Sequence, residues 1–425
     1  MQVFILIWFG QLVSLIGSGF TSFSLGIWVY QSTGKVTQFA LISLFTSLPG
    51  ILISPLAGAL VDRWDRRSCM LIADTGAGLS TLLIALLLNA NRLEVGHIYL
   101  AVAVSATFNA FRWPAYGATT TLLVPKQHLG RASGIVHMAE AASRLISPML
   151  AGLLVVTIRL EGVILIDCVT FLFAMVTLML VRFPKPKITV ENKVEKGSLL
   201  HETTYGWTYI TARPGLFGLL IFFAVSNFFI GVVTVLVTPL VLAFTSAAVL
   251  GTVLSIGGSG MLVGGLVMSA WGCPKNRVHS ILGLTLLGGL CMLFAGLMPS
   301  VPVFFVVTLI YYFSVPMING CDQAIWQSKV PPNVQGRVFA VRSMLAWASL
   351  PLAYLIAGPL ADQVFEPLLA VGGSLAGSVG QIIGVGRGHG IALLFTVMGI
   401  LDMLTVMGGY LYLPLRLLEE QLPDA

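Results

Sequence analysis

Residues 39–88 read FALISLFTSLPGILISPLAGALVDRWDRRSCMLIADTGAGLSTLLIALLL, two apolar runs separated by a short charged segment. A helix needs about 20 mostly apolar residues to cross a bilayer, and the runs 39–61 and 69–88 both reach that length. The segment between them, from Asp62 to Arg67, holds two acidic and three basic residues. This pattern predicts two membrane helices joined by a tight charged loop.

The rest of the chain repeats this pattern. Hydrophobic residues make up 57% of the sequence and charged residues only 9%, against roughly 25% charged in an ordinary soluble domain. The chain is therefore expected to be an all-α integral membrane protein, and the first span is expected to stay in the mature protein as a membrane helix. The boundary between the seventh and eighth spans is the weakest, because only Thr238-Pro239 and Thr245-Ser246 suggest a turn there, so eleven or thirteen spans stay open as alternatives to twelve. The twelve predicted spans are 3–30, 39–61, 69–88, 98–123, 132–158, 162–181, 216–244, 249–271, 281–297, 302–326, 338–361 and 391–413.

The basic residues are distributed unevenly between the connections. In this assignment sixteen lysines and arginines lie in connections after even-numbered helices and in the C-terminal tail, and four lie on the opposite face. Such a bias places both termini in the cytoplasm. The net charge of +6 thus reflects topology, and no nucleic-acid partner is expected. The five cysteines lack metal-ligand spacing, so neither a metal site nor a disulfide is expected.

The sequence also contains an internal repeat. A shift of 206 residues brings Pro125 onto Pro331, Gly130 onto Gly336 and Arg131 onto Arg337. The repeat predicts two six-helix halves related by a pseudo-two-fold axis, with a cavity between them. The expected domains are an N-terminal half (1–182), a cytoplasmic linker (183–213) and a C-terminal half (214–425). The Gly- and Ser-rich connection 363–390 on the outer face is expected to be a flexible loop with a short re-entrant or surface segment.

The charged loop after residue 57 resembles the signature loop of the major facilitator superfamily, a group of twelve-helix transporters. The resemblance implies a cytoplasmic gate that holds the two halves together, and the alternative is a purely topological role for the charges. Asp65 stands where a glycine is usual in the family. The residues that match the motif are Gly58, Asp62, Arg63, Arg66 and Arg67.

The fifth span resembles the antiporter motif of the same superfamily. Small residues at this spacing let helices approach closely, and a proline kinks the helix; plain helix packing is the alternative explanation. The stretches 335–339 and 357–362 resemble the drug:proton antiporter branch, which includes bacterial macrolide efflux and siderophore exporters. The motif positions are Gly134, Ser143, Ser147, Pro148, Ala151 and Gly152.

Six charged residues within the spans are candidates for a proton and substrate pathway, because charges inside a membrane are costly. Arg112, Glu140 and Arg144 are expected to form one cluster facing the cavity, either as a coupling site or as a structural network. Asp322 and Arg342 are expected to pair across a helical turn, and Asp402 is either a packing residue or a proton site. Two more, Asp74 and Asp167, are expected near helix ends, where water or the helix ends satisfy them.

These features favour a secondary active exporter that exchanges protons for a small lipophilic or amphipathic compound by alternating access. The chain has no Gly-rich phosphate loop, and no cofactor or enzymatic activity is expected. An importer, a lipid flippase and a non-transporting receptor stay open as alternatives. The expected partners are the substrate, protons and the lipid bilayer, and the expected form is a monomer in the inner membrane of a bacterium.

Overall fold

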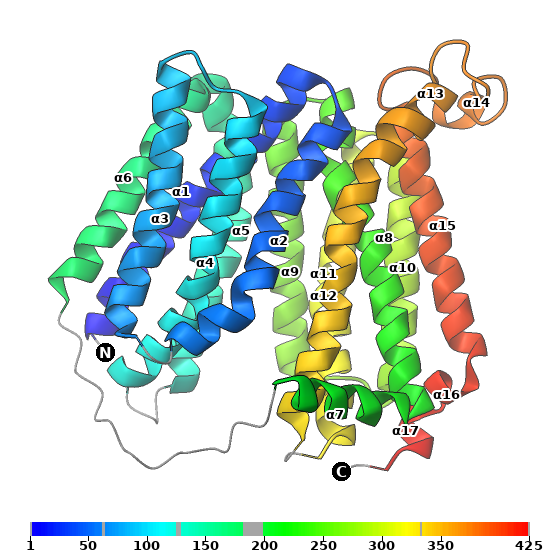
Figure 1. Ribbon diagram of the computed structural model, residues 1–425. Coiled ribbons are helices and arrows are strands. Elements are labelled where there is room, and N and C mark those ends of the chain that lie inside the picture. Colours follow the sequence, from blue (N-terminus) through cyan, green and yellow to red (C-terminus); the bar gives the residue numbers. More distant parts are fainter. Residues whose placement is uncertain (1, 62–63, 125–128, 182–198, 332–333, 424–425) are drawn as a thin grey trace. The chain divides into compact units, whose positions relative to one another are not determined.

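The computed structural model describes residues 2–61, 64–124, 129–181, 199–331 and 334–423. Twelve helices of 21 residues or more make up most of this described chain, which contains no β-strand (Figure 1). The long helices are α1 Gln2–Thr33, α2 Val36–Val61, α3 Arg66–Asn89, α4 Val95–Leu123, α5 Leu129–Thr157, α6 Arg159–Leu180, α8 Pro214–Phe244, α9 Ala247–Trp271, α10 Arg277–Leu297, α11 Val301–Lys329, α12 Gln335–Pro359 and α15 His389–Leu411.

The twelve long helices coincide with the twelve predicted spans. The uncertain boundary between the predicted spans 216–244 and 249–271 is confirmed, because α8 ends at Phe244 and α9 begins at Ala247. Within the described residues, eleven of these helices are apolar enough to cross a membrane by length and composition. The one outside that set, α4, carries Arg112 and Pro114 in its second half. The predicted fold class is confirmed.

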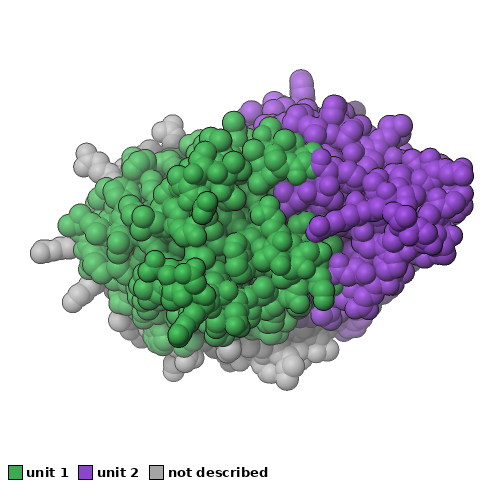
Figure 2. Space-filling model, turned by 90° about the horizontal axis from the view of Figure 1, so that it is seen from above, with its two compact units in different colours: residues 1–188, 245–255 green, residues 189–244, 256–425 purple. Residues whose placement is uncertain are grey.

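The chain divides into two compact units, coloured in Figure 2. Unit 1 contains residues 1–188 and 245–255, and unit 2 contains residues 189–244 and 256–425. In unit 1, α1 packs on α5 and α6, and α3 packs on α4 and α6. The equivalent helices of unit 2 repeat these pairs, with α8 on α12 and α15 and with α10 on α11 and α15. The repeat in the sequence is therefore also a repeat of helix packing, while the predicted domain boundaries at 182 and 213 stay a prediction.

Large apolar side chains are exposed along several of the long helices. Leu86, Leu165 and Leu266 each expose more than half of their side-chain surface. In water such a distribution would be unfavourable, but hydrocarbon solvates these side chains while the helical backbone satisfies its own polar groups. The exposed apolar faces therefore match a lipid environment.

A shorter helix, α7 (Leu199–Thr211), lies in the segment that the sequence analysis treated as a linker. Figure 1 shows it crosswise to the long helices of unit 2, and it packs on α12. Gly206 permits this contact, because a Cβ atom there would lie 2.7 Å from the backbone oxygen of Arg337. Ile210, one turn later, is fully buried, so α7 is part of the packed unit.

The connection between α12 and α15 contains three short helical segments, η2 (Leu360–Phe365), α13 (Glu366–Leu368) and α14 (Gly380–Ile383). Glu366 fixes the connection to the start of α15, because its carboxylate accepts hydrogen bonds from the backbone nitrogens of Gly388 (3.1 Å) and Ile391 (3.2 Å). An acidic side chain at a helix N-terminus also complements the helix dipole.

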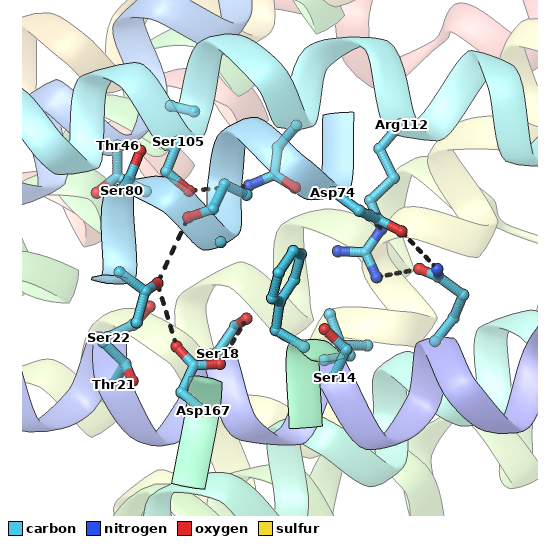
Figure 3. A pocket seen from close by; sticks show the side chains of 18 of the residues that line it. Ser14, Ser18, Thr21, Ser22, Thr46, Asp74, Ser80, Ser105, Arg112 and Asp167 are labelled. Carbon is cyan, nitrogen blue, oxygen red and sulfur yellow. Dashed lines mark hydrogen bonds and ion pairs between the residues drawn. The ribbon is translucent and has the colours of Figure 1, made fainter. Parts of the chain in front are cut away.

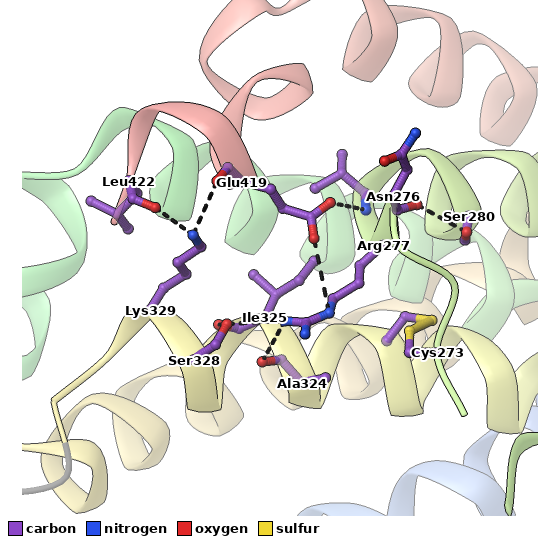
Figure 4. A network of polar contacts seen from close by, with 12 residues as sticks. Cys273, Asn276, Arg277, Ser280, Ala324, Ile325, Ser328, Lys329, Glu419 and Leu422 are labelled. Carbon is purple, nitrogen blue, oxygen red and sulfur yellow. Dashed lines mark hydrogen bonds and ion pairs between the residues drawn. A yellow bond between two sulfur atoms is a disulfide. The ribbon is translucent and has the colours of Figure 1, made fainter. Parts of the chain in front are cut away.

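The C-terminal segment is fixed to the ends of α10 and α11 by a polar network (Figure 4). The Glu419 carboxylate accepts a hydrogen bond from the backbone nitrogen of Val278 (3.1 Å) and lies 3.9 Å from Arg277 Nε. Lys329 donates to the backbone oxygens of Glu419 and Leu422. The short helices α16 (Leu413–Arg416) and α17 (Leu418–Gln421) are thereby held against unit 2.

The expectation that no cysteines pair is wrong. Cys273, just after α9, forms a disulfide with Cys321 on α11, with the two Cα atoms 5.6 Å apart. The disulfide could not be predicted from the sequence separation of 48 residues, because spacing alone does not show that the end of one helix lies against the face of another. Cys69, Cys168 and Cys291 are free.

Candidate functional site

Unit 1 contains a partly open cavity of about 720 Å³, within the range of small-molecule sites. Its lining includes hydroxyl, amide and charged side chains from all six long helices of the unit. Figure 3 shows part of this lining. Its polar residues include Gln11, Ser14, Ser18, Thr21, Ser22, Thr46, Asp74, Ser80, Thr81, Ser105, Asn109, Arg112, Glu140 and Asp167.

Helix α1 contributes a stripe of polar side chains to the cavity. Gln11, Ser14, Ser18 and Thr21 follow one another at intervals of three or four residues, which places them on one face of the helix. These residues carry no charge, and the predicted pathway consisted of charged residues alone, so it did not include this stripe. The helical spacing of polar residues in an otherwise apolar span was the signal that could have identified it.

One end of the cavity holds an ion pair between a partly buried arginine and a buried aspartate. Arg112 Nε on α4 lies 3.5 Å from Asp74 Oδ1 on α3. Gln11 bridges the pair, because its Nε2 donates to Asp74 Oδ2 (2.8 Å) and its Oε1 accepts from Arg112. Asp74 is only 5% exposed, so the expectation of a wetted carboxylate near a helix end is wrong. The helix begins at Arg66 instead of residue 69, which places Asp74 almost a turn deeper.

The expected cluster of Arg112, Glu140 and Arg144 does not form. The contacts of Arg112 are with Asp74 and Gln11, and Arg144 is exposed. Glu140 lines the same cavity as Arg112. Counting residues along a span estimates depth in the membrane, but it does not show which neighbouring helix a side chain faces.

The other end of the cavity holds Asp167 of α6 beside Ser18 (Figure 3). Its Oδ1 accepts a hydrogen bond from Ser18 (3.2 Å), and Thr81 approaches Oδ2 at 3.4 Å. Asp167 is 2% exposed and is bound by these side-chain hydroxyls eight residues after the first residue of α6, so the expectation of a carboxylate satisfied by water or by the helix end is wrong here too. The close approach of α1 to α6 depends on Gly17, where a Cβ atom would lie 2.1 Å from Thr170 Oγ1.

In unit 2 the charged residues pair within the helix packing. Arg342 of α12 forms an ion pair with Asp322 of α11 and donates to Gln323 (2.9 Å), while Trp326 donates to Asp322 Oδ1 (2.9 Å). The predicted pairing of Asp322 with Arg342 is confirmed. Asp402 of α15, which is 1% exposed, accepts a hydrogen bond from Ser226 of α8 (2.8 Å).

The signature loop is described only in part. Asp62 and Arg63 lie outside the described residues, and Gly58 and Arg66 are described only as backbone in α2 and α3. Arg67 donates a hydrogen bond to the backbone oxygen of Met179 (2.6 Å), which joins α3 to α6. Asp65, at the position where the family usually has a glycine, caps α3 by accepting from the backbone nitrogen of Ser68 (3.0 Å).

The small residues of the α5 motif lie at two helix contacts. Ser143 and Ser147 donate to the backbone oxygens of Leu15 and Ile16 on α1, each at 3.2 Å. Pro148 and Gly152 contact the first part of α9, where a Cβ atom on Gly251 would lie 2.3 Å from the Pro148 oxygen. Ala151 is fully buried, and Gly134 lies in the first turns of α5.

Long apolar helices, an internal duplication and a polar cavity inside the bundle together define a multi-pass membrane transporter. The chain belongs to the Major Facilitator Superfamily, whose family model matches residues 7–354.

Similar proteins include two kinds of efflux protein. Macrolide efflux protein A of Streptococcus pyogenes is 28% identical over 366 residues, which cover 85% of this chain and 90% of the relative. Multidrug efflux pump Tap of Mycolicibacterium fortuitum is 24% identical over 369 residues, which cover 84% and 89% of the two chains.

Solved structures share the fold at low sequence identity. A bacterial homologue of the human lysosomal transporter Spinster, in an inward-facing conformation, matches with a TM-score of 0.64 and 15% identity over 98% of this chain and 96% of that one. A D-xylose-proton symporter matches with a TM-score of 0.67 and 14% identity over 95% and 96%.

Proposed function

We propose that this chain is a proton-coupled exporter of a small lipophilic or amphipathic compound in the inner membrane of a bacterium. The observation that carries the proposal is the polar cavity of unit 1, with its Arg112–Asp74 pair and two further carboxylates. The efflux activities that the names of the relatives state support the direction of transport. Both termini are assigned to the cytoplasm from the distribution of basic residues.

The cavity offers carboxylates that a proton or a substrate can neutralise. Glu140 is the one acidic residue of α5 and lines the cavity, and we assign to it the exchange of protons for substrate. Binding of one then lowers the affinity for the other, which is the coupling that an antiporter needs. Alternating access of the two halves would then carry the substrate and the proton across the membrane in turn.

The remaining motif residues have supporting roles in this proposal. Arg112 and Asp74 form a fixed polar end of the cavity, and Arg144 contributes positive charge on α5. We assign the Asp322–Arg342 pair to the α11–α12 interface and Asp402 to packing of α15 on α8, because none of these three side chains lines the cavity. The Asp62–Arg67 loop serves as the cytoplasmic gate, and the α5 motif, from Gly134 to Gly152, sets the helix contacts.

The test is transport of a labelled macrolide in proteoliposomes with an imposed pH gradient, on the wild type and on Glu140→Gln. We expect the gradient to drive macrolide accumulation in the wild type, and Glu140→Gln to abolish the response while the protein stays folded. The matched control is Glu161→Gln, the same substitution at an exposed position near the start of α6. Flux in the wild type that ignores the gradient would contradict proton coupling and favour a facilitator or a flippase.

A further inference from the structure

Asp167 is buried in the wall of the cavity without a basic partner. Its described hydrogen bonds come from the hydroxyls of Ser18 and Thr81 alone. Arg112 acts on it only through space, since the guanidinium itself is bound to Asp74 and Gln11. A buried carboxylate is stable when a positive charge is near, and here the neighbouring protein supplies only neutral donors.

A second polar group beside Asp167 lacks a partner. The Thr21 hydroxyl lies close to the Asp167 carboxylate, but Thr21 Oγ1 makes no hydrogen bond within normal distance and angle limits to any described residue. Thr21 is 6% exposed and lines the cavity. A buried hydroxyl without a partner is unfavourable in the empty protein, and a ligand with an N–H group next to Asp167 would satisfy it.

The charges around the cavity favour a cation. Among the described lining residues, Asp74, Glu140 and Asp167 are acidic and Arg112 is the one basic residue. Arg112 balances Asp74 within their ion pair. The part of the cavity near Asp167 therefore offers a carboxylate whose described hydrogen-bond partners are neutral, and in a low-dielectric interior the ionised form of such a group attracts a cation and repels an anion.

An aromatic ring lies on the same face of α6. Phe171 follows Asp167 by four residues, and both line the cavity. The ring is held against α3, because a Cβ atom on Gly78 would lie 2.4 Å from it. A carboxylate with an aromatic ring one turn away is a favourable setting for an ammonium group, which is attracted to the face of the ring.

We propose that Asp167, Thr21 and Phe171 form the binding site for a protonated amine of the transported compound. The ammonium group would donate hydrogen bonds to the Asp167 carboxylate and to Thr21 Oγ1, with Phe171 against its alkyl substituents. This inference rests on the proposed export function and narrows the substrate class to amphipathic organic cations.

Unit 2 contains a natural comparison for this site. Ser226 and Asp402 also join the first and last long helices of their half, as Ser18 and Asp167 do. However, Asp402 does not line the cavity, and the residue four positions later is Val406, a buried aliphatic side chain. A serine–aspartate contact alone is therefore a packing feature. Asp167 differs from Asp402 because it lines the cavity and has Thr21 and Phe171 beside it there.

The test is calorimetric binding to the purified full-length protein, using erythromycin, whose amine is protonated at neutral pH, and its uncharged N-oxide. We expect Asp167→Asn to weaken erythromycin binding by about 10- to 100-fold, as for loss of a charge-assisted hydrogen bond, and to leave the N-oxide affinity nearly unchanged. Asp402→Asn, the matched control, should leave both affinities within about twofold of the wild type.

A second variant separates binding from folding. Thr21→Val removes the unpartnered hydroxyl at nearly constant volume, so we expect equal or higher thermal stability together with weaker erythromycin binding, by about 3- to 10-fold. Its control is Ser24→Ala, because Ser24 Oγ is also buried without a partner but does not line the cavity. A merely structural role for Thr21 would leave the affinity unchanged.

Each outcome decides the inference. It is overturned if the wild type binds neither compound, if it binds the N-oxide as tightly as the amine, or if Asp167→Asn weakens both alike. Should pH-driven export of neutral compounds persist in any of these cases, the proposed function stands without the amine site. Conversely, selective loss of amine binding in Asp167→Asn with no pH-driven flux in the wild type would support the site and reject proton coupling.

Discussion

At the scale of single residues, the Arg112–Asp74 pair gives a prediction about stability. Asp74→Ala leaves the guanidinium of Arg112 with Gln11 alone in the cavity wall, and breaking a buried pair on one side is strongly destabilising. We expect a loss of about 3 kcal/mol in unfolding free energy, measured as a lower melting temperature in detergent.

The double variant Asp74→Ala/Arg112→Ala is the control for that prediction. It removes both charges, so its loss should be smaller than the sum of the two single losses, since the residues interact directly. Additive losses would mean that the two side chains contribute independently and that the contact is not an energetic pair.

Charged residues within the spans can be identified directly from the sequence, but the residues that they contact are harder to predict. Asp322 and Arg342 lie on consecutive helices at similar depth, and depth can be counted along the chain, so their pairing was predictable. Asp74 and Arg112 also lie on consecutive helices, but α4 presents Arg112 to α3 and α1 instead of α5. The rotation of a helix about its axis is set by packing, and a uniformly apolar span contains little information about it.

At the scale of secondary-structure elements, the contact between α5 and α9 depends on a glycine. A Cβ atom on Gly251 would lie 2.3 Å from the backbone oxygen of Pro148, a distance that requires the helices to move apart. We expect Gly251→Ala to destabilise the protein by about 1–3 kcal/mol, as for overpacking, and to reduce transport. Thermal unfolding in detergent and proteoliposome flux measure the two effects.

The control for Gly251 lies on the same helix. At Gly265 an added Cβ atom meets nothing within 4 Å, so Gly265→Ala should be neutral or slightly stabilising through its better helix propensity. Equal effects of the two substitutions would show that helix propensity, and not the close approach to Pro148, determines the result.

Element bounds were predictable because charges and turn residues interrupt the apolar runs. The exception is α7, whose sequence LLHETTYGWTYIT is too polar for a span and was assigned to the linker. Its buried positions, Gly206 and Ile210, are four residues apart and match one helical face. A search limited to membrane-length runs cannot detect a short helix that packs on the ends of others.

At the scale of the whole molecule, the duplication extends from sequence to packing and to single contacts. The same helix pairs recur in both units, and each unit has a serine–aspartate contact, between α1 and α6 in unit 1 and between α8 and α15 in unit 2. The two units differ in the location of their buried polar residues. In unit 1 it surrounds a cavity, whereas in unit 2 Asp322, Arg342 and Asp402 are engaged within helix contacts. Copies of one ancestral half thus have different roles in the proposed mechanism.

The final prediction concerns topology. Val371, which is 90% exposed, and Gln421 flank α15, the one long helix between them. If α15 crosses the membrane once and the C-terminal tail is cytoplasmic, a cysteine at position 371 is external and one at 421 is internal. In intact cells an impermeant maleimide should label Val371→Cys, and it should label Gln421→Cys only after permeabilisation. The background needs serine in place of Cys69, Cys168, Cys273, Cys291 and Cys321. The reverse labelling pattern would invert the orientation and the proposed direction of export, and labelling of both sites in intact cells would rule out α15 as a single span.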